Sequence, residues 1–353
     1  MKAIDAYGYY FETAGSPLQR REFALDSPEP GGVLVRVAGC GLCHTDLSFY
    51  TGAVEPRCKP PIILGHEISG AVVAAGGGFE DLVGKNVIVP AVLPCGECDL
   101  CRAGRSNICL GQKMPGNDFD GGFASHVAVP GRHLCRVPEG GGDIDLAELS
   151  VIADAVTTPY QSLVRSKLAA GEVAIVVGVG GIGGYMVQLA RGAGATVIAV
   201  DIDECKLENA RAMGANHAIN AKGIDGREVK KAVRELIKQN RLPKTGWKVF
   251  ETSGTAPGQM TAFSLLSHAG TVAVVGFTME KIQVRLSNVM AFDAEVFGNW
   301  GCKPEYYPDV LAEVLQGRIN VKDNVELHPL DAINEILPLA MEHKLEKRVV
   351  FVP

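Results

Sequence analysis

The feature that most constrains the fold is a glycine-rich turn between two apolar runs. The segment Gly178-Val179-Gly180-Gly181-Ile182-Gly183 follows the apolar run 173–177 and opens a helical pattern. Asp201 ends the next apolar run, 18 residues after Gly183. Glycines in such a turn let a pyrophosphate approach the backbone at a helix N-terminus. A lone G-x-G-x-x-G is often only a glycine-rich turn, but this strand–turn–helix–strand–Asp setting predicts a Rossmann unit.

The same segment predicts which dinucleotide is bound. A carboxylate at Asp201 would accept hydrogen bonds from both ribose hydroxyls and would repel a 2′-phosphate, which favours NAD over NADP. The expected contacts are Gly178, Gly180, Gly181, Ile182, Gly183 and Asp201.

The pattern of apolar runs and turn-forming residues changes near residue 154. Before it, short branched runs at 33–37, 71–73 and 86–89 are separated by Gly and Pro clusters, as in irregular antiparallel sheet. After it, apolar runs alternate with helical patterns, which predicts a parallel sheet with helices on both faces. The expected strands are 173–177, 196–200, 248–251 and 272–276, and the expected helices are 185–191, 205–213 and 227–239. A tail from about residue 296 adds a helix at 307–315 and a strand at 348–352.

Composition narrows the class of protein. The 353 residues suffice for about two domains. A net charge of −6 disfavours bulk attraction to nucleic acid or to an anionic membrane. The most apolar stretch, 173–184, is short and broken by glycine, and no targeting segment is visible. Ten cysteines are too few for a secreted disulfide scaffold of this length, so we expect a cytoplasmic protein with free thiols.

Four of the cysteines are closely spaced. Cys95, Cys98, Cys101 and Cys109 form C-x2-C-x2-C-x7-C, a spacing that can aim four thiolates at one centre. Zinc favours four sulfur ligands in a tetrahedron, and a closed shell makes the site structural. An iron–sulfur cluster is one alternative, because its cysteine ligands can have a similar spacing. Disulfide bonds between these cysteines are the other. We predict a structural zinc lobe at about 95–109.

A second set of donors lies upstream. Cys43-His44-Thr45-Asp46 and Gly65-His66-Glu67 supply a thiolate, an imidazole and carboxylates from separate segments. Such donors suit a catalytic zinc that keeps one position open. Taken alone, a cysteine is more often a small buried hydrophobe and a histidine a satisfied polar group.

Together these segments closely resemble the zinc-dependent medium-chain alcohol dehydrogenases, in order and spacing, over nearly the full length. The resemblance implies an α/β protein in which a GroES-like catalytic domain, 1–153 and 296–353, wraps around a Rossmann domain, 154–295. It also implies an active site in the cleft between them and a homodimer or homotetramer.

The family's functional positions carry over residue by residue. Cys43 and His66 match catalytic zinc ligands, and Glu67 matches a carboxylate that lies beside the metal and can approach it. Asp154 stands where many members have a cysteine ligand, and a carboxylate oxygen is an acceptable zinc donor. Thr45 matches the hydroxyl that takes the alcohol proton, and Asp46 an acid behind the ligands.

Positions near the cofactor and the proton route also carry over. His44 and Lys206 are expected at the cofactor, Lys206 near the adenosine ribose, and Arg348 at the pyrophosphate. Members with a histidine relay carry it where Ser48 stands here. A serine can pass a proton but cannot store one near neutral pH, so the proton exit is expected through Ser48, water, His44 or the substrate itself.

The substrate class rests on further resemblance. The segments 113–117, 121–126, 153–161 and 298–302 resemble members that oxidise a secondary alicyclic alcohol carried as a CoA thioester in anaerobic aromatic degradation. Water addition to the product alkene, with Glu67 as base, is a further hypothesis. A zinc alcohol or polyol dehydrogenase for another small alcohol is the alternative.

Two readings from other classes are disfavoured. A metal-free, quinone reductase-like NADPH protein would need neither Cys43 nor His66, and it would not carry the Asp201 acid. A non-enzymatic relative would tolerate the loss of Cys43 or Thr45, yet both are present.

Overall fold

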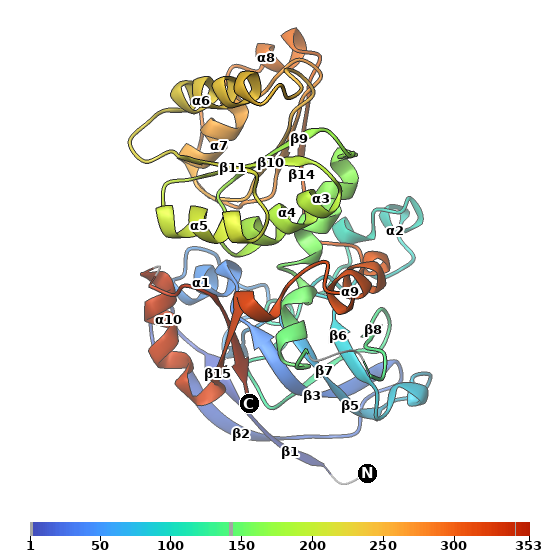
Figure 1. Ribbon diagram of the computed structural model, residues 1–353. Helices are drawn as coiled ribbons and strands as arrows, with labels where there is room; N and C mark the ends of the chain where they lie inside the picture. The colour runs from blue at the N-terminus through green and yellow to red at the C-terminus, as the bar shows by residue number, and fades with distance from the viewer. Residues whose placement is uncertain (1–2, 141–143, 343) are drawn as a thin grey trace. The chain divides into compact units, whose positions relative to one another are not determined.

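The computed structural model describes residues 3–140, 144–342 and 344–353 (Figure 1). The chain divides into two compact units, Met1–Thr157 with Gly301–Pro353, and Thr158–Trp300. These boundaries fall four and five residues later than the positions expected from the sequence. The second difference has a clear cause, since β14 (Glu295–Gly298) pairs with β13 (Thr271–Val274) and so belongs to the second unit.

The first unit is β-rich. Its larger sheet has the order β15-β16-β3-β5-β6-β8, with β7 also pairing with β3, and a smaller sheet has the order β2-β1-β4. The strands of the larger sheet are β3 (Gly32–Gly41), β5 (Glu67–Ala75), β6 (Asn86–Val89), β7 (His126–Pro130), β8 (Cys135–Arg136), β15 (Val325–Pro329) and β16 (Arg348–Val352). Those of the smaller sheet are β1 (Ile4–Phe11), β2 (Gln19–Leu25) and β4 (Ile62–Ile63).

The end of the chain joins the sheet built by its beginning. Val350 and Phe351 of β16 pair antiparallel with Gly41 and Cys40 of β3. Phe351 also packs edge-on against Phe123, with ring centroids 5.5 Å apart, in a core formed by buried apolar side chains from both stretches. This pairing places Arg348, the first residue of β16, near the end of β3.

Short helices of the first unit carry or support the site residues. They are α1 (His44–Tyr50), α2 (Asp99–Arg102), α9 (Tyr307–Leu315), α10 (Ile333–Met341) and the 3-10 helix η3 (Glu148–Ala153). All six residues of η3 are buried, so the chain reaches Asp154 from a fixed segment.

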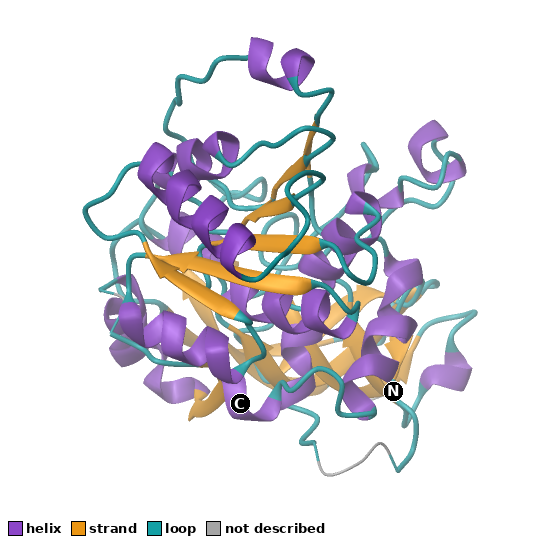
Figure 2. Cartoon of the chain, turned by 45° about the horizontal axis from the view of Figure 1, so that its top comes forward, coloured by secondary structure: helices purple, strands orange, loops and turns teal. Residues whose placement is uncertain are grey.

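The second unit is a parallel sheet of six strands in the order β11-β10-β9-β12-β13-β14. The remaining strands are β9 (Val173–Val177), β10 (Thr196–Asp201), β11 (His217–Asn220) and β12 (Lys248–Glu251). The helices are α3 (Thr157–Ser166), α4 (Gly181–Gly192), α5 (Glu204–Ala212), α6 (Gly226–Gln239), α7 (Ala256–Ser264) and α8 (Ser287–Ala291), drawn in purple in Figure 2.

Two separate apolar clusters show that helices cover both faces of this sheet. One face packs against α4 and α5 through side chains such as Met186 and Leu207. The other packs against α6 and α7 through Val229, Val233 and Ala262. The strand order is that of a Rossmann sheet, whose reversal between β9 and β12 is where dinucleotides bind. The expected fold class is confirmed.

Among the described residues, no helix combines the length and apolar character that crossing a bilayer demands.

Candidate active site and metal centres

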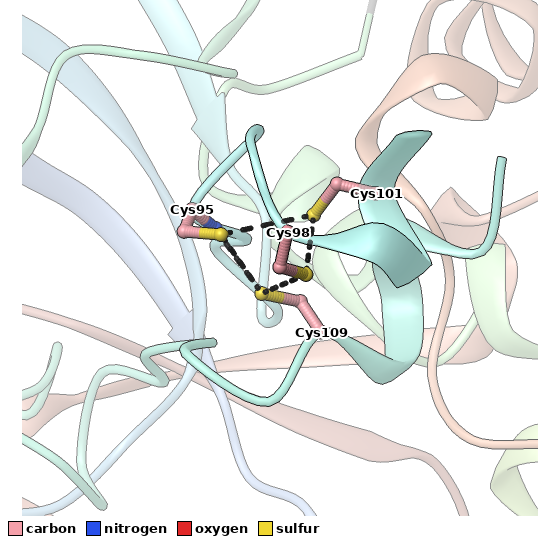
Figure 3. A group of neighbouring side chains, drawn as sticks. All are labelled: Cys95, Cys98, Cys101 and Cys109. Carbon is pink, nitrogen blue, oxygen red and sulfur yellow. Dashed lines mark hydrogen bonds between the residues drawn. The ribbon is translucent and has the colours of Figure 1, made fainter. Parts of the chain in front are cut away.

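The four closely spaced cysteines converge in the first unit (Figure 3). Cys95 Sγ lies 3.4 Å from Cys109 Sγ and 4.0 Å from Cys101 Sγ. Cys98 Sγ lies 3.5 Å from Cys101 Sγ and 3.6 Å from Cys109 Sγ. The turn of α2 presents Cys98 and Cys101, and Cys109 returns after a short 3-10 helix.

These separations select among the three interpretations of the cysteines. A disulfide needs sulfurs about 2 Å apart, and all four thiols are free. Zinc–sulfur bonds of about 2.3 Å in a tetrahedron place the sulfurs roughly 3.8 Å apart, close to the spacing seen. An iron–sulfur cluster would hold the thiolates farther apart, because its own iron and sulfide ions lie between them. The lobe therefore fits one zinc ion.

A second group of donors lies in the same unit. Cys43, His66, Glu67 and Asp154 each offer a donor atom, and these atoms all lie within 4.8 Å of one another. Asp154 Oδ2 is 3.7 Å from both Cys43 Sγ and His66 Nε2. Cys43 caps α1, His66 directly precedes β5, and Asp154 directly follows η3, so three separate segments meet here. One thiolate, one imidazole and one carboxylate form a donor set that suits a catalytic zinc.

Asp46 organises this group from behind. Its carboxylate is buried, and its Oδ1 lies 3.2 Å from His66 Nδ1 and accepts the backbone N–H of Gly65 at 3.1 Å. Its Oδ2 accepts the backbone N–H of Cys43 at 2.9 Å. A proton held on Nδ1 by Asp46 leaves Nε2, the atom that faces Asp154, as the metal donor. Burial opposes protonation of His66, but the charges of Asp46 and Cys43 prevail and raise its pKa.

Glu67 forms a buried ion pair. Both of its oxygens bind the Arg348 guanidinium, with Nε at 2.9 Å from Oε2 and Nη2 on Oε1. The Glu67 side chain is fully buried, and burial raises its pKa while Arg348 opposes that rise. Gly41, opposite Glu67 in the β3–β5 pairing, makes room for the carboxylate, since a Cβ there would lie 2.1 Å from Oε2.

The predicted proton route starts at the edge of this group. Thr45 Oγ1 lies 3.9 Å from Cys43 Sγ, so its hydroxyl stands beside the donors. One turn along α1, the Ser48 hydroxyl donates to the carbonyl of His44 at 3.0 Å. This backbone bond occupies the Ser48 proton, and the His44 side chain lies on the exposed side of the helix.

The glycine-rich turn lies in the second unit, between β9 and α4. Gly178 has a φ of +85°, and a Cβ there would lie 2.5 Å from Ser253. A Cβ on Gly183 would lie 1.9 Å from the Gly178 carbonyl oxygen. A Cβ on Gly180, by contrast, would meet nothing within 4 Å, so this glycine leaves the helix N-terminus open rather than filling a packed space. These two patterns fit a turn that is packed behind and open to a pyrophosphate in front.

Asp201 supports the same turn. Its Oδ2 accepts the backbone N–H of Val179 at 2.8 Å, and its Oδ1 accepts those of Ile202 and Asp203. The carboxylate is therefore held at the end of β10, at the edge of the sheet where the turn begins. Lys206 lies half-buried on the first part of α5, which follows Asp201.

Comparison with known proteins gives the family. A family model described as the alcohol dehydrogenase GroES-like domain matches residues 29–139, and one described as zinc-binding dehydrogenase matches residues 181–316. An alcohol dehydrogenase of Geobacillus stearothermophilus is 30% identical over 94% of this chain and 95% of its own length. The chain belongs to the zinc-type medium-chain alcohol dehydrogenases.

Other relatives of this dehydrogenase agree with that assignment. The crystal structure of the alcohol dehydrogenase from Aeropyrum pernix, 30% identical, matches with a TM-score of 0.86 over 98% of this chain and 100% of that one. A sorbitol dehydrogenase of Halalkalibacterium halodurans is 28% identical over 84% of each chain. The dehydrogenase is thus an oxidoreductase that acts on alcohols, with zinc and a nicotinamide dinucleotide as its cofactors.

Two contacts of this dehydrogenase were missed by the sequence interpretation. Arg348 was expected at the pyrophosphate, and its pairing with Glu67, 281 residues earlier, was not foreseen. Tyr307, whose buried hydroxyl bonds the peptide before Asp154, was not singled out at all. Neither contact leaves a local signal, because each joins distant segments through the pairing of β16 with β3 or the packing of α9.

Proposed function

We propose that this dehydrogenase oxidises a secondary alicyclic alcohol with NAD, using zinc held by Cys43, His66 and Asp154. The observation that carries the proposal is the convergence of these three donors, two of them buried and one half-buried, around a His66 ring that Asp46 orients. When bound, zinc supplies a Lewis acid that polarises the alcohol oxygen, and NAD supplies a hydride acceptor.

The chain's own residues then handle the proton. Oxidation of an alcohol to a ketone removes a hydride from carbon and a proton from oxygen, so one acceptor is needed for each. Thr45 stands beside the donor group and accepts the hydroxyl proton. Because Ser48 donates to the His44 carbonyl, its hydroxyl must turn away from the helix before it can continue the relay. The exposed His44 imidazole offers a second exit.

The proposed substrate is 6-hydroxycyclohex-1-ene-1-carbonyl-CoA, and the product is the 6-oxo-enoyl thioester. The support is the resemblance of segments 113–117, 121–126, 153–161 and 298–302 to the dehydrogenase that acts on this thioester in anaerobic benzoyl-CoA degradation. The alternative is a small alcohol or polyol, which the similarity to a sorbitol dehydrogenase favours.

A substrate comparison tests this proposal. Initial rates of NADH formation are measured with 6-hydroxycyclohex-1-ene-1-carbonyl-CoA, cyclohexanol, ethanol and sorbitol. We expect the thioester to have the highest kcat/KM. Rapid turnover of ethanol or sorbitol with none of the thioester would overturn the substrate and support the alternative.

Water addition to the product alkene is a second proposed reaction, in which Glu67 would act as the base. Arg348 is bound to both carboxylate oxygens of Glu67, and its positive charge weakens Glu67 as a base. Incubating the enzyme with the 6-oxo-enoyl thioester, followed by mass spectrometry for a gain of 18 Da, about one water, tests the reaction. Equal hydration by wild type and by Glu67→Gln would remove Glu67 from this role.

The NAD preference rests on the Asp201 carboxylate at the end of β10. A 2′-phosphate near a fixed carboxylate is repelled, so we expect NAD to have a much higher kcat/KM than NADP. A preference for NADP would refute this part of the proposal.

We further propose that the enzyme is a homo-oligomer joined through the edge of the Rossmann sheet. Among the described strands, β14 ends the sheet and pairs with β13 on one side only. The stretch 277–300, which contains β14, carries six large exposed apolar side chains: Phe277, Met279, Leu286, Met290, Val296 and Trp300. An unprotected apolar edge is suited to pairing with a second copy about a two-fold axis. Light scattering of the wild type and of Val296→Lys tests this; a monomeric wild type would contradict it.

A further inference from the structure

A buried tyrosine ties the candidate ligand Asp154 to the far end of the chain. Tyr307 opens α9 and is fully buried. Its hydroxyl donates to the carbonyl of Ala153, 154 residues earlier, and accepts the backbone N–H of Ala91 at 3.2 Å. The Ala91 N–H also lies 3.4 Å from the Ala153 carbonyl oxygen. One hydroxyl thus joins three segments of the first unit.

The peptide that it holds is the one that leads into Asp154. The buried 3-10 helix η3 ends at Ala153, and Asp154 follows with φ −143° and ψ −56°, outside helical geometry. Behind Asp154, the Thr157 hydroxyl donates to the Asp154 carbonyl at 3.5 Å, and the Val156 N–H donates to Val151 at 3.2 Å. The direction of the Asp154 side chain therefore depends on the orientation of the 153–154 peptide.

The hydrogen bond from Tyr307 affects Asp154 more than it affects Cys43 and His66. Cys43 and His66 are oriented by Asp46, which contacts neither Ala153 nor Tyr307 among its hydrogen bonds. Asp154 Oδ2 lies 3.7 Å from both Cys43 Sγ and His66 Nε2, and the Tyr307 hydroxyl bonds the peptide that leads into Asp154.

We propose that Tyr307 is a positioning residue that sets Asp154 for metal binding. The proposal rests on the proposed function, because it takes Asp154 as a ligand of the catalytic zinc. Replacing Tyr307 by Phe keeps the ring in the core and removes only the hydroxyl. The Ala153 carbonyl then loses the hydroxyl donor and keeps the Ala91 N–H at 3.4 Å. Residues that orient a ligand from behind typically contribute roughly 10–100-fold to metal affinity, and we expect a loss of that size at this site.

The test measures zinc affinity site by site. The full-length enzyme is titrated with a chromophoric chelator, and the zinc retained per chain is followed for wild type, Tyr307→Phe, Asp154→Ala and a matched control, Tyr9→Phe. Tyr9 is also buried in the first unit, and its hydroxyl bonds Asp331 at 2.7 Å, outside the donor group. Thermal unfolding of each zinc-loaded variant is recorded alongside.

The outcomes separate this inference from the proposed function. We expect Tyr307→Phe and Asp154→Ala to weaken the same single zinc site, with the four-cysteine site unchanged and Tyr9→Phe like wild type. If Asp154→Ala weakens one site and Tyr307→Phe binds zinc like wild type, the positioning role is overturned while the proposed function stands. If Tyr307→Phe weakens both sites together with the melting temperature, Tyr307 is only structural and the proposal is overturned. If Asp154→Ala leaves both sites intact, Asp154 is not a ligand, and both proposals fall.

Discussion

Replacing Asp46 by Asn is the most informative single change at the donor group, because the two side chains have the same shape. Asp46 accepts from Cys43 and Gly65 and lies against His66 Nδ1, and it is almost completely buried. Oδ2 faces the Cys43 N–H, and Oδ1 faces the Gly65 N–H and the histidine. An asparagine offers one oxygen and one NH2 group. Whichever way the amide turns, its NH2 group meets a backbone N–H.

The size of the effect follows from that conflict. A buried donor left without an acceptor costs about 1–3 kcal/mol, so the free energy of unfolding should fall by that amount. The negative charge of Asp46 favours the His66 tautomer with its proton on Nδ1, and the neutral asparagine removes that preference. A proton on Nε2 competes directly with the metal. We expect zinc affinity at this site to fall roughly 10–100-fold, with a comparable loss of kcat/KM.

Chelator competition and urea unfolding measure the two effects separately. A matched control is Asp118→Asn, because Asp118 is also buried and accepts a backbone N–H, that of Met114 at 3.0 Å, away from the donor group. The control should lose stability and keep its zinc affinity. If Asp46→Asn binds zinc as tightly as wild type, the role of Asp46 in orienting His66 is refuted.

Three further predictions test other parts of the molecule. Cys98→Ala should lower the zinc content from two ions per chain to one and make the 95–109 lobe sensitive to proteolysis. Native mass spectrometry measures the zinc content, and limited digestion measures the sensitivity. Two retained zinc ions would contradict the structural site. Arg348→Leu should lower the free energy of unfolding by about 3–5 kcal/mol in urea, since it leaves the Glu67 carboxylate buried without its partner. Adding Glu67→Gln should recover part of that loss. An Arg348→Leu variant as stable as wild type would show that the pair is not formed. Asp201→Ser should raise the KM for NAD about tenfold and narrow the gap to NADP, because hydrogen bonds to a charged group contribute about 1.5–3 kcal/mol; an unchanged ratio of kcat/KM values would contradict the role of Asp201.

The elements that could be predicted were those with strong local patterns. The helix predicted at 307–315 and the strands predicted at 173–177, 248–251 and 348–352 match α9, β9, β12 and β16 residue for residue. The strand predicted at 272–276 ends earlier, at Val274, because the N–H groups of Val275 and Gly276 turn to the carbonyl of Glu251. The apolar run continues to Val275, beyond the last residue of β13 that pairs with a neighbouring strand.

The donor residues could be proposed because each sits in a short motif. Cys43, His66 and Glu67 lie in two compact segments, and the four cysteines lie within fifteen residues of one another. Their mutual distances could not be predicted, since the segments meet only through the β3–β5 pairing and the end of η3. The partner of Glu67 was beyond reach for the same reason: Arg348 arrives through the antiparallel pairing of β16 with β3.

We propose that Cys43, His66 and Asp154 hold a zinc ion separate from that of the four-cysteine lobe. Anomalous scattering at the zinc edge, from crystals of the zinc-loaded enzyme, tests this directly. We expect two peaks per chain, one among Cys95, Cys98, Cys101 and Cys109 and one about 2.0–2.3 Å from Cys43 Sγ, His66 Nε2 and an Asp154 oxygen. A single peak in the four-cysteine lobe, from a preparation that still oxidises alcohols, would contradict it.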